Sequence, residues 1–270
     1  MKRIRPEDPS IFVVKKRLGQ NFLVDRRVLS RIVEACDLSP EETVLEIGPG
    51  QGALTCVIMP CVRELIAVEA DRQLVERLTG EFSGTNLRIV HADFLKFGLG
   101  DLPGPLKVVG NLPYYISTPI ITKVLENRER FTSLFMTVQL EFGERLLAPV
   151  GSKQYSSFTC WVNYFAKPTM LFKIRPGAFR PVPKVESCFM RLDMRRDPAV
   201  PVRDELLFLR IIRTAFLQRR KTLANALGVV APKDVLMEAC RRADISPGLR
   251  PEDLSLEDYA RLSDALTGGE

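Results

Sequence analysis

Histidine is almost absent from this chain, since His91 is the single one among 270 residues. A Ser-His-Asp triad and a histidine-based metal centre are therefore disfavoured, and we interpret His91 as an ordinary residue at a strand end. The six cysteines are scattered and form no C-x-x-C pair. This usage is typical of reduced thiols in a cytoplasmic protein, and we expect no metal.

Long apolar runs are also missing, and none approaches the length of a membrane span. The first residues lack an apolar signal core, and Glu7 and Asp8 disfavour a transit peptide. Hydrophobic residues nevertheless make up 46% of the chain, enough for a real core. The length allows one sizeable domain and a smaller one. We expect a cytoplasmic monomer with no membrane contact.

Positive charge is in excess and unevenly distributed. The net charge is +6. Residues 1–27 hold eight Lys or Arg against three acids, and residues 196–225 hold seven against three. Residues 226–270 reverse the balance, with five against nine. Two separate basic clusters favour a nucleic-acid partner over an ordinary solvated surface.

A glycine-rich turn follows the first predicted strand. Thr43 to Ile47 is β-branched and apolar, Glu46 to Gly52 reads E-I-G-P-G-Q-G, and a helix is predicted from about Ala53. This is the layout of a nucleotide-binding βα unit. The G-x-G-x-G spacing differs from the dinucleotide fingerprint and favours a ligand with an amino-acid part, such as S-adenosylmethionine.

The next two predicted strands also end in polar groups. Leu65 to Val68 ends at Glu69, which lies 21 residues after Gly48, where an acid binds ribose hydroxyls in nucleotide-binding folds. Leu87 to Val90 leads to Asp93, which can accept from the amino group of an adenine, with Phe94 beside the ring. Three strand ends in a row therefore predict one cofactor site.

The segment Asn111-Leu112-Pro113-Tyr114 follows a further short strand, Leu106 to Val109. An Asn side-chain oxygen and a carbonyl that precedes a proline can both accept from an exocyclic amine, while a Tyr face can stack on the ring. A turn after a strand would use similar residues. Beside a cofactor site, the segment predicts chemistry on an amino-bearing base.

The remaining chain divides at a charged, proline-containing linker, Arg195 to Val202. Before it we predict a helix at about 26–36, a strand at 134–139 with a helix after it, and late strands at 169–174 and 188–194. After it, residues 204–227 place their apolar side chains on one helical stripe, and 253–266 form the last helix. We assign residues 1–195 to a catalytic domain and 196–270 to a helical one.

These motifs together resemble the ribosomal RNA adenine dimethyltransferases, most of all the small-subunit enzymes. The segments that carry the resemblance are Lys16 to Leu23, Glu46 to Thr55, Glu69 to Asp71, His91 to Lys96, Gly110 to Ile121, Gly177 to Ser187 and Arg219 to Leu223. The resemblance implies a Rossmann-like α/β domain with a mostly parallel seven-stranded sheet and a small all-α C-terminal domain. It also implies S-adenosylmethionine as cofactor.

The implied reaction is dimethylation of the amino groups of two adjacent adenines in the terminal hairpin of 16S rRNA, within a pre-30S particle. The predicted catalytic residues are Asn111, Leu112, Pro113, Tyr114 and Phe179, the last stacking opposite Tyr114. The predicted cofactor residues are Gln20, Asn21, Leu23, Glu46, Gly48, Gly50, Gly52, Glu69, Ala70, Asp93, Phe94 and Asn111. The predicted RNA contacts are Lys16, Arg17, Arg180, Lys184, Arg213, Arg219, Arg220 and Lys221.

Two other functions stay open from the sequence. One is a relative that methylates large-subunit rRNA and confers antibiotic resistance, which more often has Ile and an acid where this chain has Leu112 and Pro119. The other is a non-catalytic RNA-binding assembly or transcription factor on the same scaffold. The intact residues Gly48, Glu69 and Asp93 disfavour that loss of cofactor binding.

Overall fold

The computed structural model describes residues 21–100 and 102–268. They form two compact units, each described here by itself. The first comprises the residues up to 143 together with Thr169–Met194, and the second comprises Glu144–Pro168 and the residues from 195 onward. The predictions at Lys16, Arg17 and Gln20 lie outside the described residues.

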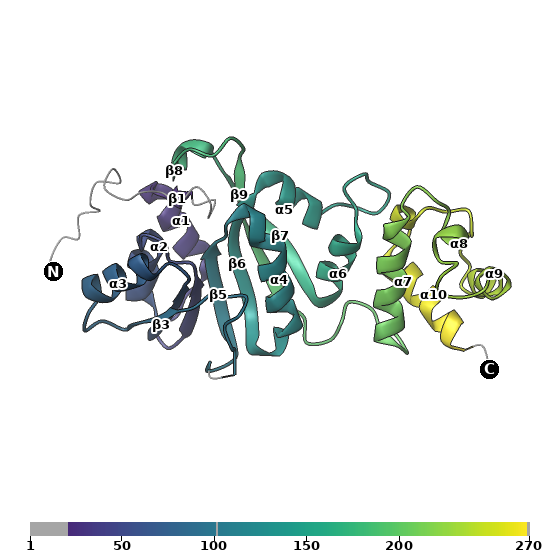
Figure 1. The fold of residues 1–270 in the computed structure, drawn as a ribbon, viewed down its shortest axis with the longest axis horizontal. Coiled ribbons are helices and arrows are strands. Elements are labelled where there is room, and N and C mark those ends of the chain that lie inside the picture. Colours follow the sequence, from purple (N-terminus) through teal and green to yellow (C-terminus); the bar gives the residue numbers. More distant parts are fainter. Residues whose placement is uncertain (1–20, 101, 269–270) are drawn as a thin grey trace. The chain divides into compact units, whose positions relative to one another are not determined.

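A seven-stranded sheet organises the fold, with the strand order β4-β3-β2-β5-β6-β9-β7 (Figure 1). The pairs among β2, β3, β4, β5 and β6 are parallel, and β9 runs antiparallel to β6. This confirms the predicted Rossmann-like sheet. Its strands are β2 (Thr43–Ile47), β3 (Glu64–Glu69), β4 (Leu87–His91), β5 (Leu106–Asn111), β6 (Phe131–Gln139), β7 (Ala166–Ile174) and β9 (Ser187–Met194).

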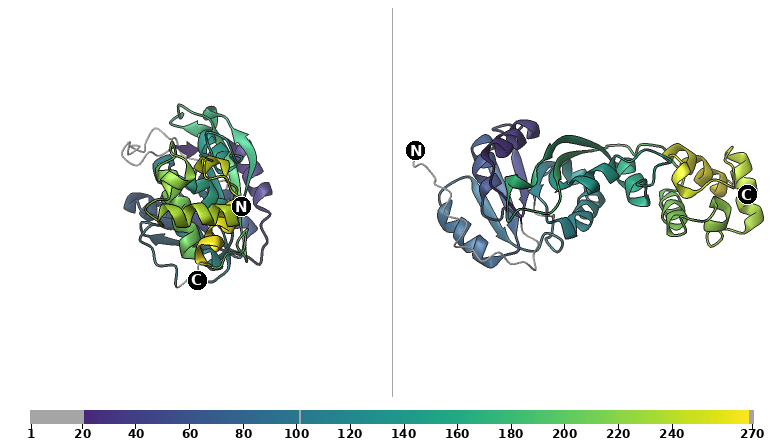
Figure 2. Two further views of the ribbon diagram at one scale, coloured as in Figure 1. Left: turned by 90° about the vertical axis from the view of Figure 1, so that its right-hand side faces the viewer. Right: turned by 90° about the horizontal axis from the view of Figure 1, so that it is seen from above.

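The helices of the first unit follow the strands in alternation. Asp25 caps the first of them, because its side chain accepts from the backbone N–H groups of Arg27 and Val28. Figure 2 shows the same helices from two further sides. They are α1 (Arg26–Cys36), α2 (Ala53–Ile58), α3 (Arg72–Glu81), α4 (Ser117–Glu126) and α5 (Leu140–Leu146), with short 3-10 turns η3 (Met59–Cys61), η4 (Tyr114–Ile116) and η5 (Arg128–Arg130).

The core of the first unit lies where strand side chains meet these helices. Parallel strands are buried on both faces, and all five residues of β2 are buried. Leu45 and Leu65 are fully buried on neighbouring strands, and Phe135 stacks on Phe189 across β6 and β9 with ring centroids 6.1 Å apart. The sheet is thus a rigid base for the loops at its edge.

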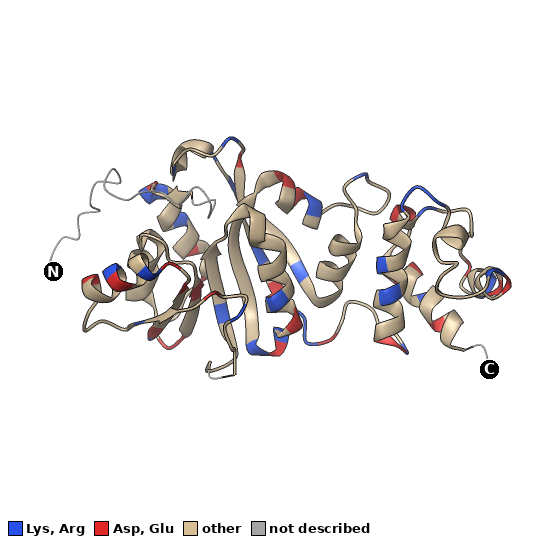
Figure 3. Cartoon of the chain, in the orientation of Figure 1, with Lys and Arg blue, Asp and Glu red and all other residues tan. Residues whose placement is uncertain are grey.

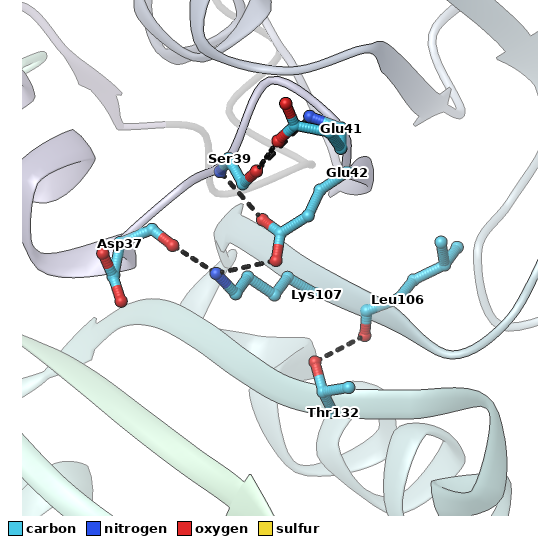
Figure 4. Close-up of polar contacts among 7 residues, drawn as sticks. All are labelled: Asp37, Ser39, Glu41, Glu42, Leu106, Lys107 and Thr132. Carbon is cyan, nitrogen blue, oxygen red and sulfur yellow. Dashed lines mark hydrogen bonds and ion pairs between the residues drawn. The ribbon is translucent and has the colours of Figure 1, made fainter.

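A polar network fixes the end of the sheet at which β2 and β5 begin (Figure 4). The Lys107 ammonium donates to the carbonyl of Asp37 and pairs with Glu42 at 3.1 Å. Glu42 in turn accepts from the backbone N–H of Ser39. Lys107 therefore ties the loop after α1 to β5 at the end of the sheet opposite to Asn111.

The second unit is mainly helical and confirms the predicted all-α character of the C-terminal part. The rings of Tyr164 and Phe208 pack at a tilt of 42° with centroids 4.8 Å apart, and the Tyr164 hydroxyl donates to Glu205. Tyr259 is fully buried and donates to the carbonyl of Pro251. The helices are α6 (Ser157–Phe165), α7 (Glu205–Leu217), α8 (Leu223–Ala226), α9 (Lys233–Arg242) and α10 (Leu256–Thr267), with η7 at Pro251–Asp253.

The segment 204–227, predicted to carry one helical stripe, is not one continuous helix, because α7 ends at Leu217 and α8 begins at Leu223. The chain turns between them, with the N–H of Lys221 donating to the carbonyl of Gln218 at 2.8 Å. The apolar stripe holds across the break, since Phe208, Leu223 and Leu227 are all fully buried. The periodicity of the apolar residues correctly predicted which side chains are buried, but it did not predict the turn after Leu217.

The boundary between the units also differs from the sequence expectation. Residues 144–168 cluster with the C-terminal helices and not with the first 143 residues. The Arg219 guanidinium donates to the carbonyls of Ser152 and Lys153, which attaches this loop to the second unit. The assignment of catalysis to 1–195 and of RNA contact to 196–270 stays a prediction. Among the described residues, no helix is long and apolar enough to cross a membrane.

Candidate functional site

A cavity of about 690 Å³ opens at the edge of the sheet where β2, β3 and β5 end. β2 lies between β3 and β5, so the chain crosses from one side of β2 to the other here. In open α/β sheets this reversal of strand order is where ligands bind. The size is that of a site for a small organic ligand.

The glycine turn forms one wall of this cavity. Gly48, Gly50 and Gly52 all have positive φ angles, of 67°, 59° and 82°. A side chain at Gly50 would come within 3.0 Å of the Phe22 ring, and one at Gly52 within 2.8 Å of Leu78. The turn therefore requires glycine for both conformation and space, and it brings the backbone close to the cavity.

Glu69 lies at the end of β3, across from the turn. Its carboxylate accepts from the backbone N–H of Gly50 at 3.1 Å and from that of Asp71 at 2.9 Å. The residue is only 7% exposed, and burial raises its pKa while these backbone donors lower it. The two backbone hydrogen bonds hold the carboxylate in one orientation. Each of its oxygens keeps a further lone pair, so the group can also accept from a diol.

Glu46 is the second buried acid of the cavity. It is 1% exposed, and the Thr55 hydroxyl donates to its carboxylate at 2.7 Å. Burial raises the pKa of Glu46 to about 8; the Thr55 hydrogen bond opposes this rise and the charge of Glu69 adds to it. In the protein without ligand, Glu46 is therefore protonated at neutral pH.

This raised pKa predicts a pH-dependent stability. Below the unfolded pKa of 4.5 both states carry the proton. Between 4.5 and about 8 only the unfolded state ionises, so the free energy of unfolding falls by about 1.4 kcal/mol per pH unit. Glu46→Gln removes this dependence. Urea unfolding of both ligand-free proteins from pH 5 to pH 8.5 measures it, and parallel curves would contradict the burial argument.

Asp93 and Phe94 form the wall next to β4. Asp93 Oδ1 accepts from the backbone N–H of Leu95 at 2.9 Å, and Oδ2 has no hydrogen-bond partner among the described residues. Phe94 is buried at 6% exposure and lines the cavity. The loop therefore offers one carboxylate oxygen and one aromatic side chain to a ligand.

Asn111 ends β5 and lines the same cavity. Its Nδ2 donates to the carbonyl of Asn21 at 2.8 Å, which leaves Oδ1 as an acceptor. Gly110, just before it, must be glycine, because a side chain there would lie 3.0 Å from the Ile47 carbonyl oxygen. The close approach of β5 to β2 thus fixes where Asn111 stands.

Tyr114 and Pro113 complete the wall after β5. The Tyr114 hydroxyl lies 2.7 Å from the Ser187 hydroxyl, and burial raises the pKa of Tyr114. The carbonyl of Pro113 accepts from the Ile116 N–H and the Ser117 hydroxyl, both at 3.1 Å. The hydrogen bond to Ser187 therefore fixes the Tyr114 ring through its hydroxyl, and Pro113 and Tyr114 both line the cavity.

A two-stranded ribbon covers the glycine turn. β1 (Phe22–Leu23) pairs antiparallel with β8 (Phe179–Arg180). Phe179 does not line the cavity: it is fully buried in the cluster that contains Leu23 and Ile174. The sandwich of a base between Phe179 and Tyr114 stays a prediction. Arg180, its neighbour, does line the cavity.

The structure thus brings most predicted site residues to one cavity. They are Asn21, Leu23, Glu46, Gly48, Gly50, Gly52, Glu69, Ala70, Asp93, Phe94, Asn111, Leu112, Pro113, Tyr114 and Arg180. Other lining residues were not predicted, among them Phe22, Arg26 and Tyr115. Tyr115 is 59% exposed, and its place beside Tyr114 was the only sequence signal for it.

Three features define a Rossmann-like methyltransferase: the order of the strands, the antiparallel pairing of β9 with β6, and the glycine turn after β2. The family described as ribosomal RNA adenine dimethylase matches residues 11–267. The chain therefore belongs to the ribosomal RNA adenine dimethylase family and is a methyltransferase.

Individual relatives agree with this membership. The chain is 42% identical to the ribosomal RNA small subunit methyltransferase A of Geobacter metallireducens, over 93% of this chain and 95% of that protein. It is 41% identical to the protein of that name from Moorella thermoacetica, with 94% and 93% covered. The solved dimethyladenosine transferase of Plasmodium falciparum superposes with a TM-score of 0.78 at 25% identity, covering 89% of this chain and 95% of that one.

A solved 23S rRNA methyltransferase, ErmE, is also similar in fold. It superposes with a TM-score of 0.71 at 29% identity, covering 92% of this chain and all of that one. The fold is thus shared by proteins named for either ribosomal subunit, so it does not by itself separate their substrates.

Proposed function

We propose that this enzyme transfers methyl groups from S-adenosylmethionine to the exocyclic amines of two adjacent adenines in the 3'-terminal hairpin loop of small-subunit rRNA. The observation that carries the proposal is the convergence of Asn111, Glu69 and Asp93 on one cavity. The relatives at 39% to 42% identity are named for the small subunit, whereas ErmE, named for 23S rRNA, is 29% identical.

The residues of the cavity suit S-adenosylmethionine. The rigid carboxylate of Glu69 matches a ribose diol, and Asp93 with Phe94 matches an adenine ring that carries an amino donor. At Gly48 an added Cβ atom would meet nothing within 4 Å, so the turn leaves open space there for the amino-acid part of the ligand. When bound, S-adenosylmethionine supplies a methyl group that its positive sulfur already makes electrophilic, so the protein has to supply alignment above all.

Asn111, Leu112 and Tyr114 would hold the target adenine. The Asn111 Oδ1 and the Leu112 carbonyl accept from the amine, which turns its lone pair toward the methyl group. Tyr114, fixed by Ser187, presents a face for stacking. The proton leaves after transfer, when the nitrogen is cationic, so no strong base is needed. The target base must be unpaired or flipped out.

Transfer of labelled methyl groups tests this function directly. We expect label from S-adenosylmethionine to enter small subunits that lack the modification, as dimethyladenosine in the terminal hairpin. Label in large subunits instead would favour the resistance-type activity. No label in either, with RNA binding intact, would favour the non-catalytic factor. The proposal places the chain in the cytoplasm, acting as a monomer on a pre-30S particle.

The basic residues of the second unit divide into two kinds. Arg219 is engaged within the unit: it donates to two loop carbonyls and pairs with Glu252 at 3.3 Å. Its predicted RNA contact therefore competes with a structural role. Arg213, Arg220 and Lys221 are exposed. Figure 3 shows basic bands along α7, which carries Arg213. We propose these three as phosphate contacts.

Salt dependence separates the two kinds. Arg220→Ala with Lys221→Ala should weaken small-subunit binding and flatten its salt dependence, each lost phosphate contact removing about 0.7–0.9 from the log–log slope. Arg219→Ala should instead lower the melting temperature, because two loop carbonyls lose their donor. Salt titrations and thermal melts of both variants measure this. An unchanged slope in the double variant would show merely solvated side chains.

A further inference from the structure

Lys123 makes an unusual set of contacts for a lysine on a helix. It lies on α4, and its ammonium donates to three backbone carbonyls: Phe94 at 2.7 Å, Leu95 at 3.2 Å and Phe97 at 2.5 Å. A lysine ammonium has three N–H donors, so these contacts use its full capacity. The nitrogen also lies 5.2 Å from the centre of the Phe94 ring.

The three carbonyls belong to the tight turn that begins at Asp93. The N–H groups of Lys96 and Phe97 both donate to the Asp93 carbonyl at 2.9 Å, so the turn is helix-like and its later carbonyls face its end. The Phe94 carbonyl also accepts from the N–H of Phe97 at 3.3 Å. Carbonyls at the end of a helical turn favour a cation. Lys123 supplies both the donors and the charge.

α4 also begins at the other half of the site. The Ser117 hydroxyl, in its first turn, donates to the carbonyl of Pro113, within the segment that lines the target-base wall. Lys123 lies six residues later on the same helix. One rigid helix thus joins the Asn111–Tyr114 segment to the loop that carries Asp93 and Phe94.

We propose that Lys123 is a positioning residue for the methyl donor: by holding the carbonyls of the 94–97 turn, it sets Asp93 and Phe94 at the adenine end of the cavity. The inference rests on the proposed function, in which that end receives the adenine of S-adenosylmethionine. Asp93 can then distinguish an amino group from a carbonyl oxygen at position six of the purine ring, but only while Lys123 holds the 94–97 turn in place.

Binding of two product analogues tests this. S-Adenosylhomocysteine carries the amino group, and S-inosylhomocysteine carries an oxygen in its place. We expect the unmodified protein to prefer the first by about tenfold or more in calorimetry. Lys123→Met keeps the aliphatic stem but should weaken S-adenosylhomocysteine binding about tenfold and reduce the preference below about threefold. Lys123→Arg should restore part of the preference, because a guanidinium also donates to carbonyls.

Lys96→Met is the matched control, since Lys96 lies in the same turn with an exposed side chain and should keep both affinities. In turnover, Lys123→Met should raise the KM for S-adenosylmethionine more than it lowers kcat. Equal weakening for both analogues, with the preference intact, would show a merely structural lysine and overturn the inference. Failure of the unmodified protein to bind S-adenosylhomocysteine would overturn the proposed function as well.

Discussion

Replacement of Asn111 by alanine should lower methyl transfer by about 100- to 1000-fold. The side chain supplies an acceptor that aligns the amine, and an aligning group acts mainly in the transition state. Its orientation is fixed, because Nδ2 donates to the Asn21 carbonyl at 2.8 Å and Oδ1 remains for the substrate. The affinity for S-adenosylhomocysteine should stay near that of the unmodified protein.

Glu69→Ala should weaken cofactor binding and leave kcat nearly unchanged, the reverse of Asn111→Ala. It therefore serves as a control for a general loss of folded structure. Loss of the buried carboxylate should weaken the binding of S-adenosylmethionine by about 1–3 kcal/mol, through lost hydrogen bonds to the ribose. The kcat at saturating cofactor should change far less. Single-turnover rates and calorimetry on both variants give the comparison. Near-normal turnover in Asn111→Ala would remove Asn111 from the catalytic step.

Sequence reasoning located this cavity well because its signals are local. A strand followed by glycines, or by an acid, is written in a few adjacent residues, and parallel strands bring all such ends to one edge of the sheet. Gly48, Glu69, Asp93 and Asn111 could be chosen on that basis before their distances were known. All four line one cavity.

The remaining features depend on contacts between distant residues, which periodicity does not carry. Phe179 reads as a ligand-facing aromatic in a proline-rich loop, yet β1 pairs with β8 and buries it. Lys123 reads as an ordinary exposed lysine of a helix, yet the turn after β4 supplies three acceptors for it. The helix break after Leu217 could not be predicted from a proline or glycine, because residues 218–222 contain neither.

Gly143 shows a further feature that only the folded chain defines, and it predicts a large loss of stability. It lies in α5, where a Cβ atom would stand 2.4 Å from the Cys188 sulfur and 3.1 Å from the Met190 sulfur. Both partners are fully buried on β9. Such overpacking costs about 1–3 kcal/mol or more, against a gain of up to about 1 kcal/mol in helix propensity. Gly143→Ala should therefore be destabilising.

Gly80→Ala is the matched control, because Gly80 also lies in a helix and a Cβ there would meet nothing within 4 Å. That variant should gain up to about 1 kcal/mol from propensity alone. In a Cys188→Ala background the penalty at Gly143 should largely disappear, since the clashing sulfur is gone, and a double-mutant cycle measures this coupling. Chemical unfolding of the four proteins of the cycle and of Gly80→Ala gives the values. If Gly143→Ala proved as stable as Gly80→Ala, α5 would not be packed against β9 at this distance, and the requirement for glycine there would fail.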